Sequence, residues 1–251
     1  MMGIYLKPLL KRVLPAPAYR TWWRTKIWVR EKRLRNLSRT EVFDTIYRDN
    51  MWGGPDKLSG YGSSGPHAAA YIDFVKRFAK EKGVRTVLDG GCGDFSIGSQ
   101  ICDCVESYIA TDISDVIIGV NKVRHSAFKN VEFRRLDLCV DPLPPADLIT
   151  IREVFQHLSN ADIALALANI EKSSARYVLI TEHVPADHRL MAPNLDKPRG
   201  SQIRNMFGSG VYINLPPFNR PAEAVFRVEH PSTAWTSASN LVTSLWKRQP
   251  Q

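Results

Sequence analysis

Residues 84–95, VRTVLDGGCGDF, constrain the fold of this chain more than any other stretch. A short apolar run ends at Asp89, and three glycines follow within the next four residues. This order is typical of a buried strand that ends in a tight turn. Because glycine has no Cβ, such a turn brings its backbone close to a ligand. We expect residues 96–101 to begin a helix whose N-terminal N–H groups face the same ligand.

Strand-like and helix-like segments alternate along the rest of the chain. Further strands are predicted at residues 107–112, 131–135, 147–152 and 177–181, and a terminal hairpin at residues 224–229 and 240–246. This alternation implies parallel strands with right-handed crossovers. The predicted fold class is α/β: a Rossmann-like, doubly wound, mostly parallel seven-stranded sheet. An antiparallel C-terminal hairpin and an N-terminal helical extension complete it.

The chain divides into three predicted regions. Residues 1–36 form a basic amphipathic N-terminal arm, residues 37–83 carry helices and a Gly/Ser-rich lid, and residues 84–251 form the ligand-binding domain. Ser38 and Glu41 have the spacing of a capping box, which predicts that a helix starts there.

Charged residues stand at the ends of four predicted strands. They are Asp89, Asp112, Asp137 and the pair Arg152-Glu153. In an open parallel sheet the ligand binds outside the carboxyl ends of the strands, so we expect these side chains to lie together. Asp112 follows the glycine turn by one strand–helix–strand unit and can accept both hydroxyls of a ribose. That feature alone is shared with NAD enzymes.

The glycine turn differs from the dinucleotide pattern G-x-G-x-x-G. Ser96 stands at the third glycine, and the Asp89 carboxylate would repel a pyrophosphate. It suits a positive amino group, such as that of the methionine part of S-adenosylmethionine. The stretch resembles motif I of the class I S-adenosylmethionine-dependent methyltransferases, D-x-G-x-G-x-G, with Phe95 in place of the last glycine. An NAD oxidoreductase is therefore disfavoured.

The resemblance implies S-adenosylmethionine as the cofactor. Asp137 with Leu138 matches the acidic position that meets the adenine amino group, and Phe95, Ile113 and Leu138 would enclose the adenine. The expected cofactor residues are Asp89, Gly90, Gly91, Gly93, Phe95, Asp112, Ile113, Asp137 and Leu138.

A closer likeness is to bacterial methyltransferases associated with glycan biosynthesis, and it extends over residues 46–246. Trp52-Gly53, Ser59-Gly60, Asp89-x-x-Cys92-Gly93-Asp94-Phe95, His157-Leu158 and Pro216-Pro217-Phe218 carry it. It implies a small-molecule or glycan acceptor that is methylated on a hydroxyl. The residues expected to contact this acceptor are Tyr47, Trp52, Tyr61 and His183.

Methyl transfer from a sulfonium is an in-line displacement, so the protein mainly positions donor and acceptor. A hydroxyl acceptor also calls for a general base. We predict His157 as that base, because the unperturbed pKa of histidine is near neutral, and Glu182 as the alternative. Arg152 is expected to orient an anionic acceptor. His183 and His188 do not have the spacing of a metal site, so no metal is expected.

The net charge of +9 lies entirely in residues 1–36, which contain ten Lys or Arg and one acidic residue. Trp22, Trp23 and Trp28 are interleaved with these cations. Three interpretations stay open: an anionic membrane surface, a nucleic-acid backbone, and a helix that packs on its own domain through its tryptophans. We expect peripheral contact with an anionic membrane and no nucleic-acid partner, since the rest of the chain is neutral.

The remaining composition favours a cytoplasmic protein at the inner membrane face. No apolar run reaches the ~18 residues of a membrane span, and the first ten residues lack the features of a signal peptide. The four cysteines form no metal or disulfide pattern, which favours reduced thiols. Two alternative functions remain. An RNA methyltransferase is disfavoured because no N-P-P-Y-like tetrapeptide follows the fourth strand, and the other alternative is a non-catalytic partner protein of the same fold.

Overall fold

The chain forms two compact units, Met1–Leu37 and Ser38–Gln251. The computed structural model describes Thr25, Val29 and residues 31–53, 57–187, 192–230 and 238–248. In the first unit Thr25, Val29 and residues 31–34 are helical, and the three tryptophans of the basic arm lie outside the described residues. None of the described helices is long and apolar enough to cross a membrane.

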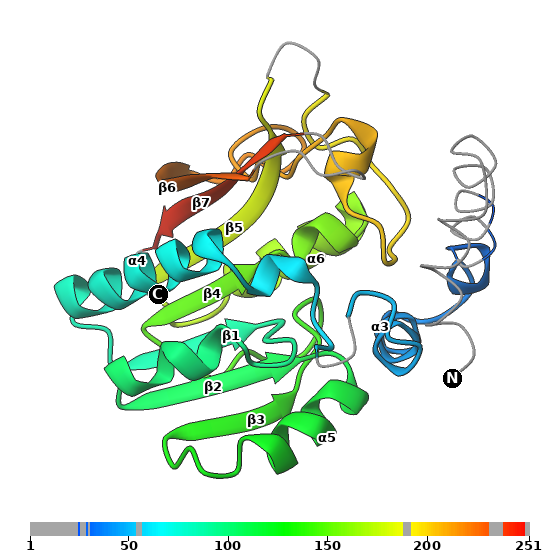
Figure 1. Ribbon diagram of the computed structural model, residues 1–251. Helices are drawn as coiled ribbons and strands as arrows, with labels where there is room; N and C mark the ends of the chain where they lie inside the picture. Colours follow the sequence, from blue (N-terminus) through cyan, green and yellow to red (C-terminus); the bar gives the residue numbers. More distant parts are fainter. Residues whose placement is uncertain are drawn as a thin grey trace. The chain divides into compact units, whose positions relative to one another are not determined.

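Seven strands of the second unit form one sheet, in the order β3-β2-β1-β4-β5-β7-β6 (Figure 1). Their bounds are β1 Thr86–Gly90, β2 Ser107–Asp112, β3 Val131–Arg135, β4 Leu148–Arg152, β5 Tyr177–Pro185, β6 Ala222–His230 and β7 Ser239–Lys247. The first five strands are parallel, and β7 runs antiparallel to both β5 and β6. The predicted mostly parallel sheet with its antiparallel C-terminal hairpin is confirmed.

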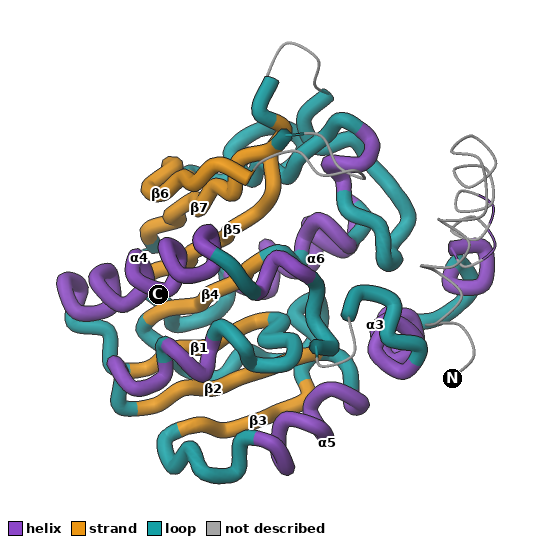
Figure 2. The backbone as a smooth tube through the Cα atoms, viewed as in Figure 1, coloured by secondary structure: helices purple, strands orange, loops and turns teal. Residues whose placement is uncertain are grey.

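Helical segments lie before and between the strands (Figure 2). The α-helices are α3 Arg39–Arg48, α4 Pro66–Lys82, α5 Asp115–Arg124 and α6 Asn160–Ile170, and the 3-10 turns are η1 Tyr61–Ser63, η2 Gly98–Gln100, η3 Cys102–Cys104, η4 Phe155–His157 and η6 Arg204–Phe207. The predicted capping box starts α3: Ser38 Oγ accepts the Glu41 N–H, and the Glu41 carboxylate accepts the Ser38 N–H. Two backbone donors at the helix start are thereby satisfied.

The central strands β1, β2, β4 and β5 are buried on both faces. On one face Val87, Leu148 and Leu179 join apolar residues of α4 and α5 in one hydrophobic cluster. Successive strand residues face opposite sides, so the buried Leu88 and Ile149 face the other side. The β4-to-β5 crossover runs along the sheet in the opposite direction to the β2-to-β3 crossover. Right-handed connections therefore place α6 opposite α5, as a doubly wound sheet requires.

The helix predicted at residues 96–101 does not form as an α-helix. Two 3-10 turns, η2 and η3, stand in its place. The backbone there closes i-to-i+3 bonds, from Gln100 N to Ile97 O and from Ile101 N to Gly98 O. The Gln100 side chain also donates to the Ser96 carbonyl across 2.9 Å. The Gln100 side chain thus takes the Ser96 carbonyl that the Gln100 N–H would bond in an α-helix.

Chain order reverses beside β1. From there β2 and β3 lie in one direction along the sheet, and β4 and β5 in the other. At such a switch point the loops after neighbouring strands diverge to opposite faces, which leaves a crevice at their carboxyl ends. The glycine turn after β1 stands at this crevice.

Candidate functional site

A cavity of about 400 Å³ occupies the crevice at the carboxyl ends of β1 to β5. The lining residues include Arg39, Tyr47, Trp52, Asp89, Gly91, Gly93, Asp112, Ile113, Asp137, Leu138, Arg152, Glu153, Gln156, His157, His183 and Ser239. Most of the residues expected from the sequence therefore meet in one space. Gly90, Phe95 and Glu182 are not among the lining residues, and the Tyr61 side chain lies outside the described part of the chain.

Two glycines of the turn have conformations that other residues rarely adopt. Gly91 has φ +83° and Gly93 has φ +56°. A Cβ on Gly91 would stand 2.4 Å from Val154 Cγ2, and a Cβ on Gly93 would stand 2.3 Å from Ser59 Oγ. The turn is therefore restricted to glycine both by its backbone and by its neighbours.

Asp112, at the end of β2, is buried beside this turn. Its carboxylate accepts the Gly93 N–H across 3.2 Å, the Ser114 N–H across 3.0 Å and the Tyr47 hydroxyl across 3.3 Å. Burial raises the pKa of Asp112 to about 6, although these donors favour the ionised form. The carboxylate is thus fixed in direction, and it lines the cavity.

Asp89, the last acidic residue before the glycines, is held in a similar way. Tyr108 Oη donates to its Oδ2 across 2.9 Å, and Thr150 Oγ1 donates to its Oδ1 across 3.1 Å. Burial raises the pKa of Asp89 to about 6. A buried carboxylate of this kind favours a cationic partner in the cavity.

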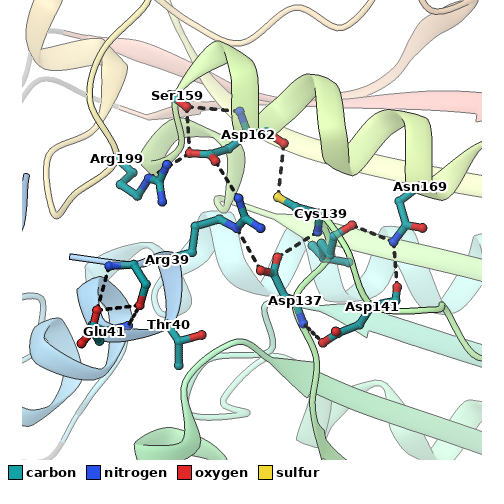
Figure 3. A network of polar contacts seen from close by, with 12 residues as sticks. Arg39, Thr40, Glu41, Asp137, Cys139, Asp141, Ser159, Asp162, Asn169 and Arg199 are labelled. Carbon is teal, nitrogen blue, oxygen red and sulfur yellow. Dashed lines mark hydrogen bonds and ion pairs between the residues drawn. The ribbon is translucent and has the colours of Figure 1, made fainter. Parts of the chain in front are cut away.

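Asp137 is tied into a network that involves three other segments (Figure 3). Arg39 of α3 reaches between two carboxylates: its Nε lies 2.9 Å from Asp137 Oδ2, and its Nη1 lies 3.2 Å from Asp162 Oδ1. The Cys139 N–H donates a hydrogen bond to Asp137 Oδ1 across 2.9 Å. Arg199 also pairs with Asp162, at 3.1 Å. The sequence did not predict that Arg39 would contact the expected adenine carboxylate.

Phe95 does not lie where the resemblance placed it. Its side chain is fully buried and packs edge-on against Tyr108, Phe128 and Phe133. It is not a lining residue of the cavity, so the prediction that it encloses the adenine is not supported. Its backbone φ of +62° shows that it adopts the conformation expected of the glycine it replaces.

The segment predicted to be a lid contributes Trp52, Ser59, Gly60 and Gly62 to the cavity wall, and its described residues are fastened at three points. The Leu58 and Ser59 N–H groups donate to Asp94 Oδ2 across 3.2 and 3.0 Å. Trp52 Nε1 donates to the Ser201 carbonyl across 3.0 Å. Arg152 Nη2 donates to the Gly62 carbonyl across 2.7 Å, so the arginine predicted to orient an anionic acceptor lines the cavity and also binds the lid.

His157 lines the cavity and is buried against Trp52 and the loop that carries Gly200. Its Nδ1 lies 3.2 Å from the Gly200 carbonyl, and its ring stacks at a tilt on Trp52, with the centroids 4.5 Å apart. Burial, and then the positive charge of Lys197, lowers its pKa to about 3. The near-neutral pKa expected from the sequence is therefore wrong, and the ring is neutral at physiological pH.

The Glu182 side chain is buried next to the cavity but is not one of its lining residues. Its carboxyl group accepts the Phe155 N–H across 2.7 Å and the Gln156 N–H across 3.2 Å, at the start of η4. It is 2% exposed, and burial raises its pKa to about 8. It positions the turn after β4 and does not face the cavity, so it does not fit the alternative role of general base.

Glu153 stands at the end of a predicted strand, but the sequence does not mark it as a site residue. Its carboxylate lies 2.8 Å from Arg152 Nη2 and 3.5 Å from His183 Nε2. Burial acts to raise its pKa, but the Arg152 charge and the His183 hydrogen bond outweigh it, and the pKa falls well below its usual value. The Glu153 side chain therefore stays ionised in the cavity wall.

Gln156 and Ser239 were missed altogether. Gln156 Nε2 donates to the Glu153 carbonyl, which leaves Oε1 as a buried acceptor without a hydrogen-bond partner among the described residues. Ser239 opens β7 and approaches the cavity only because β7 pairs with β5. No local sequence pattern marks Ser239, since its role depends on strand pairing. Among the described residues no group of three or more His, Cys, Asp or Glu could hold a metal ion.

Comparisons with known proteins agree on the fold. No protein-family model matches the sequence, and no curated protein matches it. The solved structure of the N-methyltransferase NodS from Bradyrhizobium japonicum WM9, with bound S-adenosylhomocysteine, superposes with a TM-score of 0.58. At 16% identity it covers 80% of this chain and 98% of NodS. TehB from Haemophilus influenzae is similar at a TM-score of 0.52 and 16% identity, over 75% of this chain and 66% of TehB.

A third structure is the methyltransferase domain of bacterial CtHen1. It superposes with a TM-score of 0.51 at 12% identity, over 71% of this chain and 98% of that domain. Identities this low establish a shared Rossmann-like fold and nothing finer. The function must be argued from the site of this chain.

Proposed function

We propose that this chain is an S-adenosylmethionine-dependent methyltransferase whose acceptor is a hydroxyl group of a small molecule or glycan. The observation that carries the proposal is the position of Asp112. Its buried carboxylate faces the cavity beside a glycine turn, one strand away from β1 at the switch point of the sheet. A ribose with two free hydroxyls is the ligand group that suits such a carboxylate.

The remaining cavity walls support the same cofactor. Ile113 and Leu138 supply apolar surfaces at the β2 and β3 end, which suits an adenine ring. Asp89 lies beside the turn after β1, where its ionised carboxylate would attract the cofactor's ammonium group. The donor sulfonium would then lie toward β4, between the adenosine and methionine parts.

The β4 and β5 end of the cavity suits a polar acceptor. Glu153, Gln156 and His183 present hydrogen-bonding groups there, and Trp52 adds an aromatic face that can pack on a sugar ring. Gly62 of the lid lies against Glu153 at this end. A cavity of about 400 Å³ favours a small molecule or the end of a glycan over a folded macromolecule. Tyr47 contacts Asp112 and belongs with the cofactor end.

The basic arm extends the proposal to location. Residues 1–36 carry the whole excess of positive charge. We propose that they attach the enzyme peripherally to anionic lipid at the cytoplasmic face, where a lipid-linked acceptor would be concentrated. An RNA acceptor is not favoured, because the chain beyond the arm has no excess of cations to neutralise phosphates.

The proposal is tested by methyl transfer. The full-length protein is incubated with methyl-labelled S-adenosylmethionine and, in separate reactions, nucleotide sugars, free oligosaccharides, lipid-linked glycans, phenols and total RNA. Mass spectrometry is expected to find the label on an oxygen of a small molecule or glycan. Label found only on RNA, or only on nitrogen, would overturn the acceptor assignment.

A further inference from the structure

Three cavity residues on adjacent strands form a hydrogen-bonded series. Glu153 directly follows β4, His183 lies in β5, and Ser239 opens β7. His183 Nδ1 lies 3.0 Å from Ser239 Oγ. Its Nε2 lies 3.5 Å from Glu153 Oε2. All three residues line the cavity at the end that we assign to the acceptor.

The charge of Glu153 sets the direction of these hydrogen bonds. Its carboxylate pairs with Arg152 at 2.8 Å and is ionised, so it only accepts hydrogen bonds. Nε2 of a neutral His183 therefore carries the ring proton and donates to Glu153. Nδ1 then has a lone pair, and the Ser239 hydroxyl donates to it. The lone pairs of Ser239 Oγ remain able to accept a proton from a further hydroxyl.

The backbone holds Glu153 in an unusual position for this contact. Its φ is +57°, in the left-handed region, which is unfavourable for a residue with a Cβ. The lid packs directly on its carboxylate: a Cβ on Gly62 would stand 2.1 Å from Glu153 Oε2. Arg152 holds the carbonyl of the same glycine. Surroundings on both sides thus keep the carboxylate facing His183.

We propose that Glu153, His183 and Ser239 form a proton relay that deprotonates the acceptor hydroxyl during methyl transfer. The inference rests on the proposed function. As the acceptor oxygen forms its bond to the methyl carbon, the carbon–sulfur bond breaks and its electron pair stays on sulfur. The sulfonium becomes a neutral thioether. The acceptor proton moves to Ser239 Oγ while the serine proton moves to His183 Nδ1.

The step leaves an imidazolium between a serine and a carboxylate. Glu153 stabilises this cation, and the proton then passes to solvent when product leaves. His157 is the weaker base, because burial and the nearby charge of Lys197 lower its pKa to about 3. The relay therefore replaces His157 as the base, and His157 becomes a positioning residue for the loop that carries Gly200 and Ser201.

The direction of the relay is measurable without an acceptor. The full-length protein, labelled with ¹⁵N-histidine and saturated with S-adenosylhomocysteine, is studied by long-range ¹H–¹⁵N correlation NMR. The His183 signals are those lost in His183→Gln. We expect the ring proton on Nε2, a bare Nδ1 whose shift changes in Ser239→Ala, and loss of the single tautomer in Glu153→Gln. A ring proton on Nδ1 would overturn the relay, because His183 would then donate to Ser239.

Turnover gives the second readout, with any acceptor that the labelling panel identifies. His183→Gln and Ser239→Ala should each lower the turnover number by roughly 10²–10⁴-fold, the usual contribution of a general base. Their affinity for S-adenosylhomocysteine should stay within about twofold, since no cofactor-end contact is removed. Ser239→Thr, which keeps the hydroxyl, should recover most of the turnover.

Thr243→Val is the matched control, because it removes another buried hydroxyl from β7 that is not a lining residue of the cavity. Its turnover should stay close to that of the wild type. Full turnover of Ser239→Ala would refute the relay while leaving the methyltransferase assignment intact. Absence of S-adenosylhomocysteine binding in the wild-type protein would instead refute the proposed function.

Discussion

The amide N–H of Gly93 donates to Oδ2 of Asp112 across 3.2 Å. This bond joins the glycine turn after β1 to the carboxylate at the end of β2. The cofactor site was predicted from these two features, and they are in direct contact. The Tyr47 hydroxyl donates to the same oxygen across 3.3 Å and adds α3 to this contact. The carboxylate is therefore oriented before any ligand binds, which reduces the entropy lost on binding.

Asp112→Asn should weaken the binding of S-adenosylhomocysteine by at least about tenfold. A hydrogen bond to a charged group contributes ~1.5–3 kcal/mol, and ~1.4 kcal/mol corresponds to a tenfold change in affinity. Asp115→Asn is the matched control, because Asp115 is exposed at the start of α5 and does not line the cavity. Calorimetry on the three proteins measures the effect. Equal affinities of the wild type and Asp112→Asn would show that Asp112 does not bind the cofactor.

Cofactor affinity should fall as the pH is lowered through about 6. Asp112 has a pKa of about 6 in the free protein, and ribose hydroxyls favour its ionised form. Protonation must therefore compete with binding, and it can weaken affinity by up to about tenfold per pH unit below the pKa. Asp89, with a similar pKa, contributes in the same direction. Titrations between pH 5 and 7.5 should show a shallower pH dependence in Asp112→Asn, and an unchanged slope would contradict the assignment.

Gly93→Ala should destabilise the protein and weaken cofactor binding together. The new Cβ would stand 2.3 Å from Ser59 Oγ at a φ of +56°, and a left-handed backbone costs a residue with a Cβ roughly 1–2 kcal/mol. Gly119→Ala provides the contrast, since nothing lies within 4 Å of its Cβ position in α5. That helix change should stabilise the protein by up to about 1 kcal/mol. Urea denaturation measures the free energy of unfolding of both variants. Equal changes in Gly93→Ala and Gly119→Ala would be inconsistent with a turn that only glycine can form.

Deletion of residues 1–36 should abolish binding to anionic liposomes and leave cofactor affinity unchanged. The deletion removes the entire charge excess, while every lining residue of the cavity lies beyond it. Binding of the full-length protein should weaken as salt is added, because screening shortens the range of the attraction. Sedimentation with phosphatidylserine vesicles is the measurement, and neutral vesicles are the control. A full-length protein that ignores anionic vesicles at low salt would contradict membrane attachment.

Much of the sheet could be predicted because its signals are local. The bounds of β2 and β3 were predicted to the residue: β2 is a mostly apolar run that ends at Asp112, and β3 begins with alternating apolar and charged residues. The carboxylates at the strand ends followed from topology alone, because parallel strands bring their carboxyl ends to one edge. Asp112 and Asp137 accordingly line one cavity.

The residues at the acceptor end of the cavity were harder to predict, because their contacts form between segments that are far apart in the sequence. Ser239 meets His183 only through the register of β7 on β5. Glu153 follows β4, and Glu182 follows the strand predicted at residues 177–181, so the two look equivalent in the sequence. In the structure β5 continues to Pro185, Glu182 caps η4 and Glu153 faces the cavity. The pKa of His157 likewise depends on burial by Trp52 and the Gly200 loop, which no local pattern reveals.

The central claim is the identity of the cofactor, and calorimetric titration of the full-length protein tests it most directly. S-adenosylmethionine and S-adenosylhomocysteine should each bind at one site per chain and compete with each other. NAD should not bind, because Asp89 would repel its pyrophosphate and the turn lacks the third glycine at Ser96. Tight binding of NAD, with no heat from either S-adenosyl compound, would contradict the account.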